Sequence, residues 1–314
     1  MFYLYLNSIS FSLLILGMLI SVAYLTLLER KLLGYIQNRK GPNKVGFIGL
    51  FQPFSDAIKL FSKEKKIFLG VNVLIYLISP MLMFLCSLML WLIFFLKNGM
   101  FFFIFGVLFM FSVMGLSVYY IMFMGWSSDN NYSLIGGLRG VIQVVSYEIS
   151  MVMFMLVMLT YTMSFDLIKF IMNQKNIWLL FNFSLFMMMM SSLLAEMSRT
   201  PFDFIEGESE LVSGFNVEFG GYLFAFIFLS EYLMILFISY LMVVIFFSSE
   251  IFLFMVYKFL LLIFLIIWVR GSFPRYRYDK LMNLNWKFYL PISMNFLVFF
   301  FSLKLFIIYT ILIW

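Results

Sequence analysis

The sequence contains no histidine and a single cysteine, Cys86. Without histidine, the chain lacks the commonest metal ligand, haem ligand and general base near neutral pH. One cysteine excludes an internal disulfide and an iron–sulfur cluster held by this chain alone. Neither a phosphate-binding loop nor a dinucleotide-binding fingerprint occurs in the sequence. Any redox cofactor that the reaction needs must therefore be bound by other subunits.

Charged residues are also scarce, at 11% of 314 residues, whereas 64% of the residues are hydrophobic. This composition lies far outside the range of soluble domains and predicts an all-α membrane protein. Ala, which has G/C-rich codons, occurs four times, whereas Phe, which has A/T-rich codons, occurs 44 times. This usage indicates a gene in an A/T-biased genome, such as that of an organelle. Residues 1–28 carry no charge, so we expect neither a signal peptide nor an import sequence.

Eight apolar runs are long enough to cross a hydrocarbon core of roughly 30 Å as helices. They are residues 8–28, 69–96, 101–124, 141–165, 177–195, 219–247, 251–269 and 288–313. The alternating pattern of a membrane β-barrel is absent from the sequence, so helices are the only option. We therefore expect a single polytopic domain over residues 1–314, with three long connections at 29–68, 196–218 and 270–287.

Lys and Arg residues are distributed unequally between the connections. The odd-numbered connections hold sixteen of them and the even-numbered ones hold three, namely Lys97, Lys169 and Lys175. The positive-inside rule then predicts odd connections inside and both termini outside. In a mitochondrial inner membrane these would be the matrix and intermembrane sides. All three long connections would share the inner face.

The first connection contains a predicted surface helix at residues 47–62. Leu50, Phe54, Ile58 and Phe61 recur at three- and four-residue steps, which favours an amphipathic helix lying in the membrane interface. A plain membrane anchor explains this helix alone. A functional role requires Asp56 and Gln52 to face a cavity.

Six of the fifteen acidic residues lie between Glu196 and Glu218. Thr200, Pro201 and Asp203 resemble a helix start, with a hydroxyl cap, proline at the first position and an acid near the N-terminus. Arg199 is spaced to pair with Glu196 or Asp203. That structural interpretation explains only part of the segment.

Glu206, Glu208 and Glu210 need a further explanation. Gly207 favours a bent loop in which their carboxylates converge, and such carboxylates titrate as a group. We favour a proton path here, and a solvated acidic surface is the alternative. Glu148 and Glu231 lie within apolar runs, where an acid is a functional-site hypothesis by default. For Glu231 the alternative is a hydrogen bond to another helix, from Lys258 or a tyrosine.

Two basic segments can be explained without a role in the reaction. Residues 29–31, Glu-Arg-Lys, read as a stop signal at the end of the first span. Residues 270–278 are basic and aromatic, so they fit either anionic lipid or an acidic soluble subunit. Gly136 and Gly140 are spaced for close helix approach.

Several long motifs resemble one family. They are residues 29–35, 39–44, 52–60, 199–203 and 206–216. Together they are similar to chain 1 of NADH–ubiquinone oxidoreductase, the mitochondrially encoded heel subunit family of respiratory complex I. The residue usage resembles arthropod members.

The resemblance implies eight spans, the surface helix, and a ubiquinone tunnel near the first span, the surface helix and the sixth span. Ubiquinone would be the substrate, with FMN and iron–sulfur clusters on partner subunits of the soluble arm. The other partners would be membrane-arm subunits and membrane lipids. The implied quinone-binding residues are Glu29, Arg30, Arg39, Asp56, Arg199, Phe228 and Arg275. The implied proton path is Glu148, Glu196, Asp203, Glu206, Glu208, Glu210, Glu218 and Glu231.

Other classes of protein account for less of the sequence. A carboxylate-based secondary transporter would explain Glu148 and Glu231 but predicts repeat symmetry that the sequence lacks. The anchor subunit of a related hydrogenase-type complex would share part of the fold but should lack the full run 206–216. A scaffold without further function leaves the acids unexplained.

Overall fold

The computed structural model describes residues 2–64, 67, 70–93, 104–174, 178–205, 207–247 and 252–313. Helices make up nearly all the regular structure in these ranges, and no strand occurs among them. Seven helical segments among the described residues are long and apolar enough to cross a membrane. They contain α1 (Phe2–Ile36), α3 (Val73–Leu90), α4 (Gly106–Ser127), α5 (Asn131–Thr162), α10 (Tyr222–Met242), α11 (Phe252–Ser272) and α13 (Leu290–Ile313). The predicted class, an all-α membrane protein, is confirmed.

The fifth predicted span has a different form. Residue 177 lies outside the described residues, and beyond it the chain forms α7 (Trp178–Phe181) and the shorter α8 (Phe183–Glu196). Between them Asn182 leaves the helical conformation, at φ −122° and ψ 39°. Its side-chain oxygen accepts a hydrogen bond from Tyr161 on α5, at 3.1 Å. Hydropathy alone does not register such a break.

Two helices extend beyond their predicted ends. The first, α1, runs to Ile36, past the charged residues that read as a stop signal. The fourth span starts at Asn131, where Asn130 caps the backbone N–H of Tyr132 at 3.1 Å. At the C-terminus, α12 (Tyr278–Leu284) and a π-helical turn (Asn285–Tyr289) lead directly into α13. Charged residues that have partners inside the protein do not need to end a helix.

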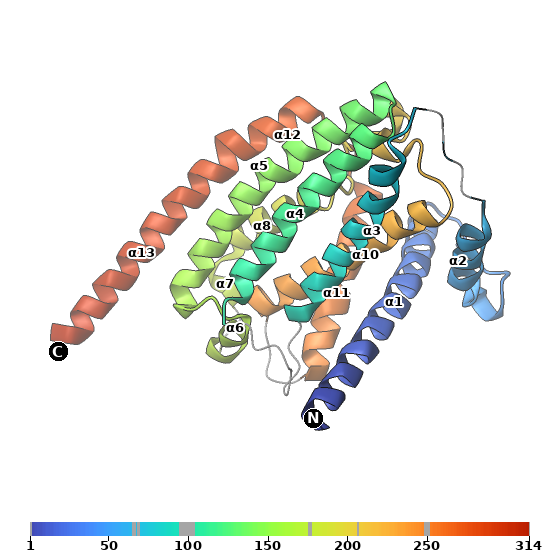
Figure 1. The fold of residues 1–314 in the computed structure, drawn as a ribbon. Helices are drawn as coiled ribbons and strands as arrows, with labels where there is room; N and C mark the ends of the chain where they lie inside the picture. Colours follow the sequence, from blue (N-terminus) through green and yellow to red (C-terminus); the bar gives the residue numbers. More distant parts are fainter. Residues whose placement is uncertain are drawn as a thin grey trace.

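The helices form one tilted bundle (Figure 1). Helices α3, α4 and α5 pack side by side, α10 packs against α3, and α8 packs against α5. The large buried side chains include Trp91, Tyr147, Phe154 and Phe237. The two ends of the chain lie on the same side of the bundle, opposite α2 (Gln52–Ser62) and α12.

The surface helix is confirmed, with a later start than predicted. Residues Phe47–Gly49 form a separate 3₁₀ turn, in which Ile48 and Gly49 have positive φ values of 55° and 79°. A Cβ at Gly49 would lie 2.4 Å from the carbonyl oxygen of Pro42, so this turn requires glycine. Phe54, Ile58 and Phe61 remain exposed along α2. Exposed apolar side chains on one face fit a helix lying at the membrane surface.

The predicted helix start at Thr200-Pro201 is wrong. Residues 197–205 form turns and bends, and the Thr200–Pro201 peptide is cis. The buried amide of Gln143 on α5 donates to the carbonyl oxygens of Ala195 (2.7 Å) and Phe202 (2.8 Å). This side chain therefore satisfies carbonyl groups that a helix would otherwise pair. The described chain then continues through α9 (Glu208–Leu211) and a 3₁₀ turn (Gly214–Asn216) to α10.

The glycine pair at 136 and 140 permits close approach, mainly to loop residues. A Cβ at Gly136 would lie 2.9 Å from Cα of Gly214, and one at Gly140 would meet the side chain of Ile205. The contact between α4 and α5 uses Gly125 and Gly137 instead, where an added Cβ would be about 3.1 Å from the facing Cα. The connection before α10 is thus held directly on α5.

Candidate functional site

A cavity of about 510 Å³ opens between α1, α2 and α10. Its wall is largely apolar, with Leu60, Phe224 and Leu229 among the lining residues. Four of the predicted quinone-binding residues line it: Glu29, Arg30, Asp56 and Phe228. Asp56 therefore faces a cavity, whereas Gln52 is not among the residues that line it. An apolar cavity with a few charged groups is typical of a site for an amphipathic small molecule.

Four of the charged side chains that line this cavity form two ion pairs. Arg30 on α1 pairs with Asp56 on α2, and Gln52 donates to the other carboxylate oxygen of Asp56 at 2.9 Å. Glu29 is only 5% exposed and pairs with Arg270 at the end of α11. Charges at membrane depth need such partners because an unpaired charge is costly there. Glu29 is thus an internal ion-pair member rather than part of a stop signal.

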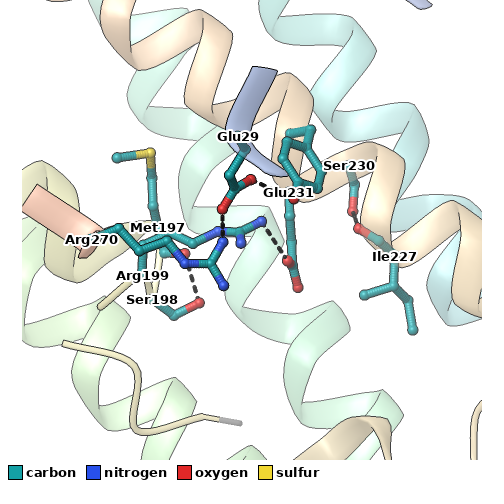
Figure 2. Close-up of polar contacts among 9 residues, drawn as sticks. Glu29, Met197, Ser198, Arg199, Ile227, Ser230, Glu231 and Arg270 are labelled. Carbon is teal, nitrogen blue, oxygen red and sulfur yellow. Dashed lines mark hydrogen bonds and ion pairs between the residues drawn. The ribbon is translucent and has the colours of Figure 1, made fainter. Parts of the chain in front are cut away.

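A second group of charges adjoins Glu29. The hydroxyl of Tyr232 donates to Oε2 of Glu29 at 2.6 Å. The guanidinium of Arg199 lies 4.7 Å from the centroid of the Tyr232 ring and pairs with Glu231 at 3.2 Å. Figure 2 shows Arg199 and Arg270 side by side, the first directed to Glu231 and the second to Glu29. Side chains from α1, α10, α11 and the segment after α8 therefore converge here.

A smaller cavity of about 50 Å³ continues from Glu231 into the bundle. Glu196 and Glu231 both line it, together with Ser87, Ser117 and Ser230. This volume suffices for a few water molecules. Neither carboxylate oxygen of Glu196 has a hydrogen-bond partner among the described residues. Glu148 lies farther along, where Oε1 would be 3.2 Å from a Cβ placed on Gly115 of α4.

Three further predicted site residues that the structure describes, Arg39, Asp203 and Glu218, line neither cavity. Asp203 is nearly buried and pairs with Arg275 at 3.0 Å. Arg39 is exposed and donates to Gln37 at 2.9 Å. Glu218 accepts a hydrogen bond from Asn130 at 2.9 Å. These residues are close to the loops rather than to the cavity between α1, α2 and α10.

The predicted convergence of three carboxylates is only partly described. Glu206 lies outside the described residues, and Glu208 opens α9. Glu210 pairs with Arg139 of α5 at 2.6 Å, and its side chain is 56% exposed. Glu210 is therefore held against α5 at the surface.

Several predicted partners are wrong. Arg199 pairs with Glu231 on α10, whereas Asp203 pairs with Arg275 and Glu196 has no hydrogen-bond partner among the described residues. Lys258, one proposed partner of Glu231, donates instead to the carbonyl oxygen of Phe247 at 2.6 Å. In the basic segment 270–278, Arg270 and Arg275 pair within the chain.

Sequence reasoning missed Tyr232, Arg270 and Gln143. Tyr232 follows Glu231 in an apolar run, and Arg270 ends another, so each carries a weak signal of burial near charge. Gln143 is a polar residue in an apolar run, and it is fully buried. Their partners are distant in sequence, and no local spacing rule identifies them.

The structure is thus that of a helical membrane protein with a charged cavity and buried acids beside it. Residues 9–301 match the family model described as NADH dehydrogenase. The chain is 50% identical to NADH-ubiquinone oxidoreductase chain 1 of Aedes aegypti over 298 residues, which are 94% of this chain and 95% of that protein. The chain-1 protein of Locusta migratoria is 48% identical, with 97% of each chain covered. That of Myxine glutinosa is 50% identical, with 92% of this chain and 93% of that protein covered.

The chain therefore belongs to the NADH dehydrogenase family, as a membrane subunit of the enzyme NADH–ubiquinone oxidoreductase, complex I. The family resemblance drawn from the motifs is confirmed, and arthropod proteins are among the relatives. The secondary-transporter alternative is set aside.

Proposed function

We propose that the cavity between α1, α2 and α10 admits ubiquinone from the bilayer and forms part of the path to its reduction site. The observation that carries the proposal is the position of Glu29, Arg30, Asp56 and Phe228 in one cavity of about 510 Å³. An isoprenoid tail suits the apolar wall, and quinone oxygens accept hydrogen bonds from arginine. Arg39, Arg199 and Arg275 would act nearer the loops, where the head group leaves the bilayer.

The proton path is proposed to start at the same cavity. Glu29, Tyr232, Arg199 and Glu231 form a continuous set of contacts from the large cavity to the small one. Glu196 follows in the small cavity, and Glu148 lies beyond it. Carboxylic acids placed in this order can pass protons through intervening water molecules. Asp203, Glu206, Glu208, Glu210 and Glu218 would serve the loop side of the path.

The proposal also assigns a location and partners. The chain would lie in the mitochondrial inner membrane, with the three long connections at the matrix and both termini in the intermembrane space. Ubiquinone is the substrate, and FMN and the iron–sulfur clusters belong to partner subunits of the soluble arm. That arm would dock over α2, α12 and the loop segments, which lie on one side of the bundle (Figure 1). Other membrane-arm subunits and lipids would cover the apolar flanks.

An Asp56→Asn variant of the assembled complex tests the quinone path. Removing one charge of a cavity ion pair should lower quinone reduction roughly tenfold at constant NADH, while assembly is retained. Lys169→Gln is the control, because Lys169 is an exposed charge on α6 (Leu167–Asn173), which lies on the side of the bundle opposite α2 and α12. NADH oxidation by an artificial acceptor at the soluble arm should be unchanged in both variants. Loss of assembled complex on native gels, with normal specific activity in the remainder, would contradict the proposal.

A further inference from the structure

Tyr232 stands between the two groups of charges. It lies on α10, is 6% exposed, and lines the large cavity. Its hydroxyl donates to Glu29, which is already paired with Arg270. Its ring lies beneath the guanidinium of Arg199. One side chain therefore contacts a member of each ion pair.

The position of Tyr232 follows from the helix. Glu231 and Tyr232 are consecutive, so their side chains leave α10 about 100° apart. The guanidinium of Arg199 contacts both side chains. One of its nitrogens lies 3.2 Å from the Glu231 carboxylate, and its central carbon lies 4.7 Å from the centroid of the Tyr232 ring. Phe228, one turn earlier, lies 6.0 Å from the Tyr232 ring between centroids. The ring is thus held by packing on one side and by a cation on the other.

We propose that Tyr232 is a positioning residue that makes the placement of Arg199 depend on the charge of Glu29. While Glu29 is ionised, it accepts the hydroxyl proton in a charge-assisted hydrogen bond and fixes the ring under Arg199. When Glu29 takes up a proton, this hydrogen bond loses its charge assistance, and when Glu29 turns to a bound ligand, the hydroxyl loses its acceptor. The ring is then held less firmly, and Arg199 and Glu231 lose a fixed support. Tyr232 keeps its own proton throughout.

This inference rests on the proposed function, since it links the quinone cavity to the acids of the proton path. It adds a residue that neither set of predicted site residues contains. A purely structural role is the competing explanation, because Tyr232 is nearly buried and touches Phe228. The two explanations differ in whether the effect of Tyr232 passes through Glu29.

A double-mutant cycle on the assembled complex separates them. Tyr232→Phe keeps the ring and removes only the hydroxyl, so the KM for a short-tailed ubiquinone should stay within about twofold while kcat falls about tenfold. Glu29→Gln should also lower kcat. If Tyr232 acts through Glu29, the double variant should be no slower than Glu29→Gln alone. Multiplicative effects, or a wild-type rate for Tyr232→Phe, would overturn the inference.

Tyr161→Phe is the matched control. It removes another hydroxyl hydrogen bond inside the bundle, to Asn182 at 3.1 Å, away from both cavities. Its effect should multiply with that of Glu29→Gln. A Glu29→Gln variant with undisturbed quinone reduction would refute the proposed function itself. A slow Glu29→Gln variant with an independent Tyr232→Phe effect would refute only the role of Tyr232.

Discussion

Glu29, Asp203 and Glu231 each lie against an arginine from a distant part of the chain. Glu196 differs, because neither of its carboxylate oxygens has a hydrogen-bond partner among the described residues. Burying a carboxylate without a partner is costly and is retained where function requires it. Among the described acids, Glu196 is therefore the residue whose substitution tests the proton path most directly.

We expect Glu196→Gln to lower proton pumping and quinone reduction at least tenfold per assembled complex, because the amide cannot take up and release a proton. Glu64→Gln is the control and should stay within about twofold, since Glu64 is exposed and lines neither cavity. Both activities are measured in reconstituted vesicles. Equal, small effects of the two substitutions would remove Glu196 from the path.

The residue types of the site could be predicted from the sequence, but their pairings could not. Charged residues stand out in so apolar a chain, and the family motifs include Glu29, Arg30 and Asp56. Local spacing suggested Glu196 or Asp203 for Arg199, whereas the partner is Glu231, on another helix. Helical spacing rules describe neighbours within one helix and say nothing about contacts between helices.

At the scale of elements, hydropathy located the long helices but misplaced several ends. The end of α1 was placed at Glu29 because isolated charges mark membrane boundaries, yet the internal pair with Arg270 allows the helix to continue. The break at Asn182 and the irregular segment after Glu196 depend on hydrogen bonds from Tyr161 and Gln143. Both donors lie on α5, far from the affected residues in sequence.

The contact between α5 and the acidic connection, 196–218, gives a prediction about how the two pack together. Gly136→Ala would place a Cβ 2.9 Å from backbone Cα of Gly214, so one of the two elements must move. We expect a loss of about 1–3 kcal/mol in stability, seen as a lower melting temperature of the complex, with reduced quinone reduction. Gly220→Ala is the control, because nothing lies within 4 Å of its added Cβ. Identical melting temperatures for the two variants would show that the contact is dispensable.

At the scale of the whole molecule, the long connections gather on one side and the termini on the other (Figure 1). Contacts tie two of these connections, 196–218 and 270–287, together: the backbone N–H of Tyr276 donates to the carbonyl of Pro201 at 3.0 Å, and Arg275 pairs with Asp203. The relative placement of these two connections is therefore fixed within the chain. Which membrane face they occupy follows only from the distribution of basic residues.

Cysteine labelling tests this orientation. In a Cys86→Ser background, Lys40→Cys should react with a membrane-impermeant maleimide only in inside-out vesicles, after a chaotrope has stripped the soluble arm. Met172→Cys, whose native side chain is 69% exposed in α6 (Leu167–Asn173), should react only in vesicles of the opposite orientation. The reverse pattern would invert the assigned topology.

The Glu29–Arg270 pair also has a consequence for biogenesis. Ribosomes make the chain from its N-terminus, so Glu29 enters the membrane long before α11 has been synthesised. Until Arg270 arrives, the acid at the end of α1 lacks its cationic partner. The ion pair that joins the first helix to α11 can therefore form only after α11 has been inserted. A truncated nascent chain ending before α11 would expose an uncompensated acid, a mark by which quality-control proteases could recognise incomplete chains.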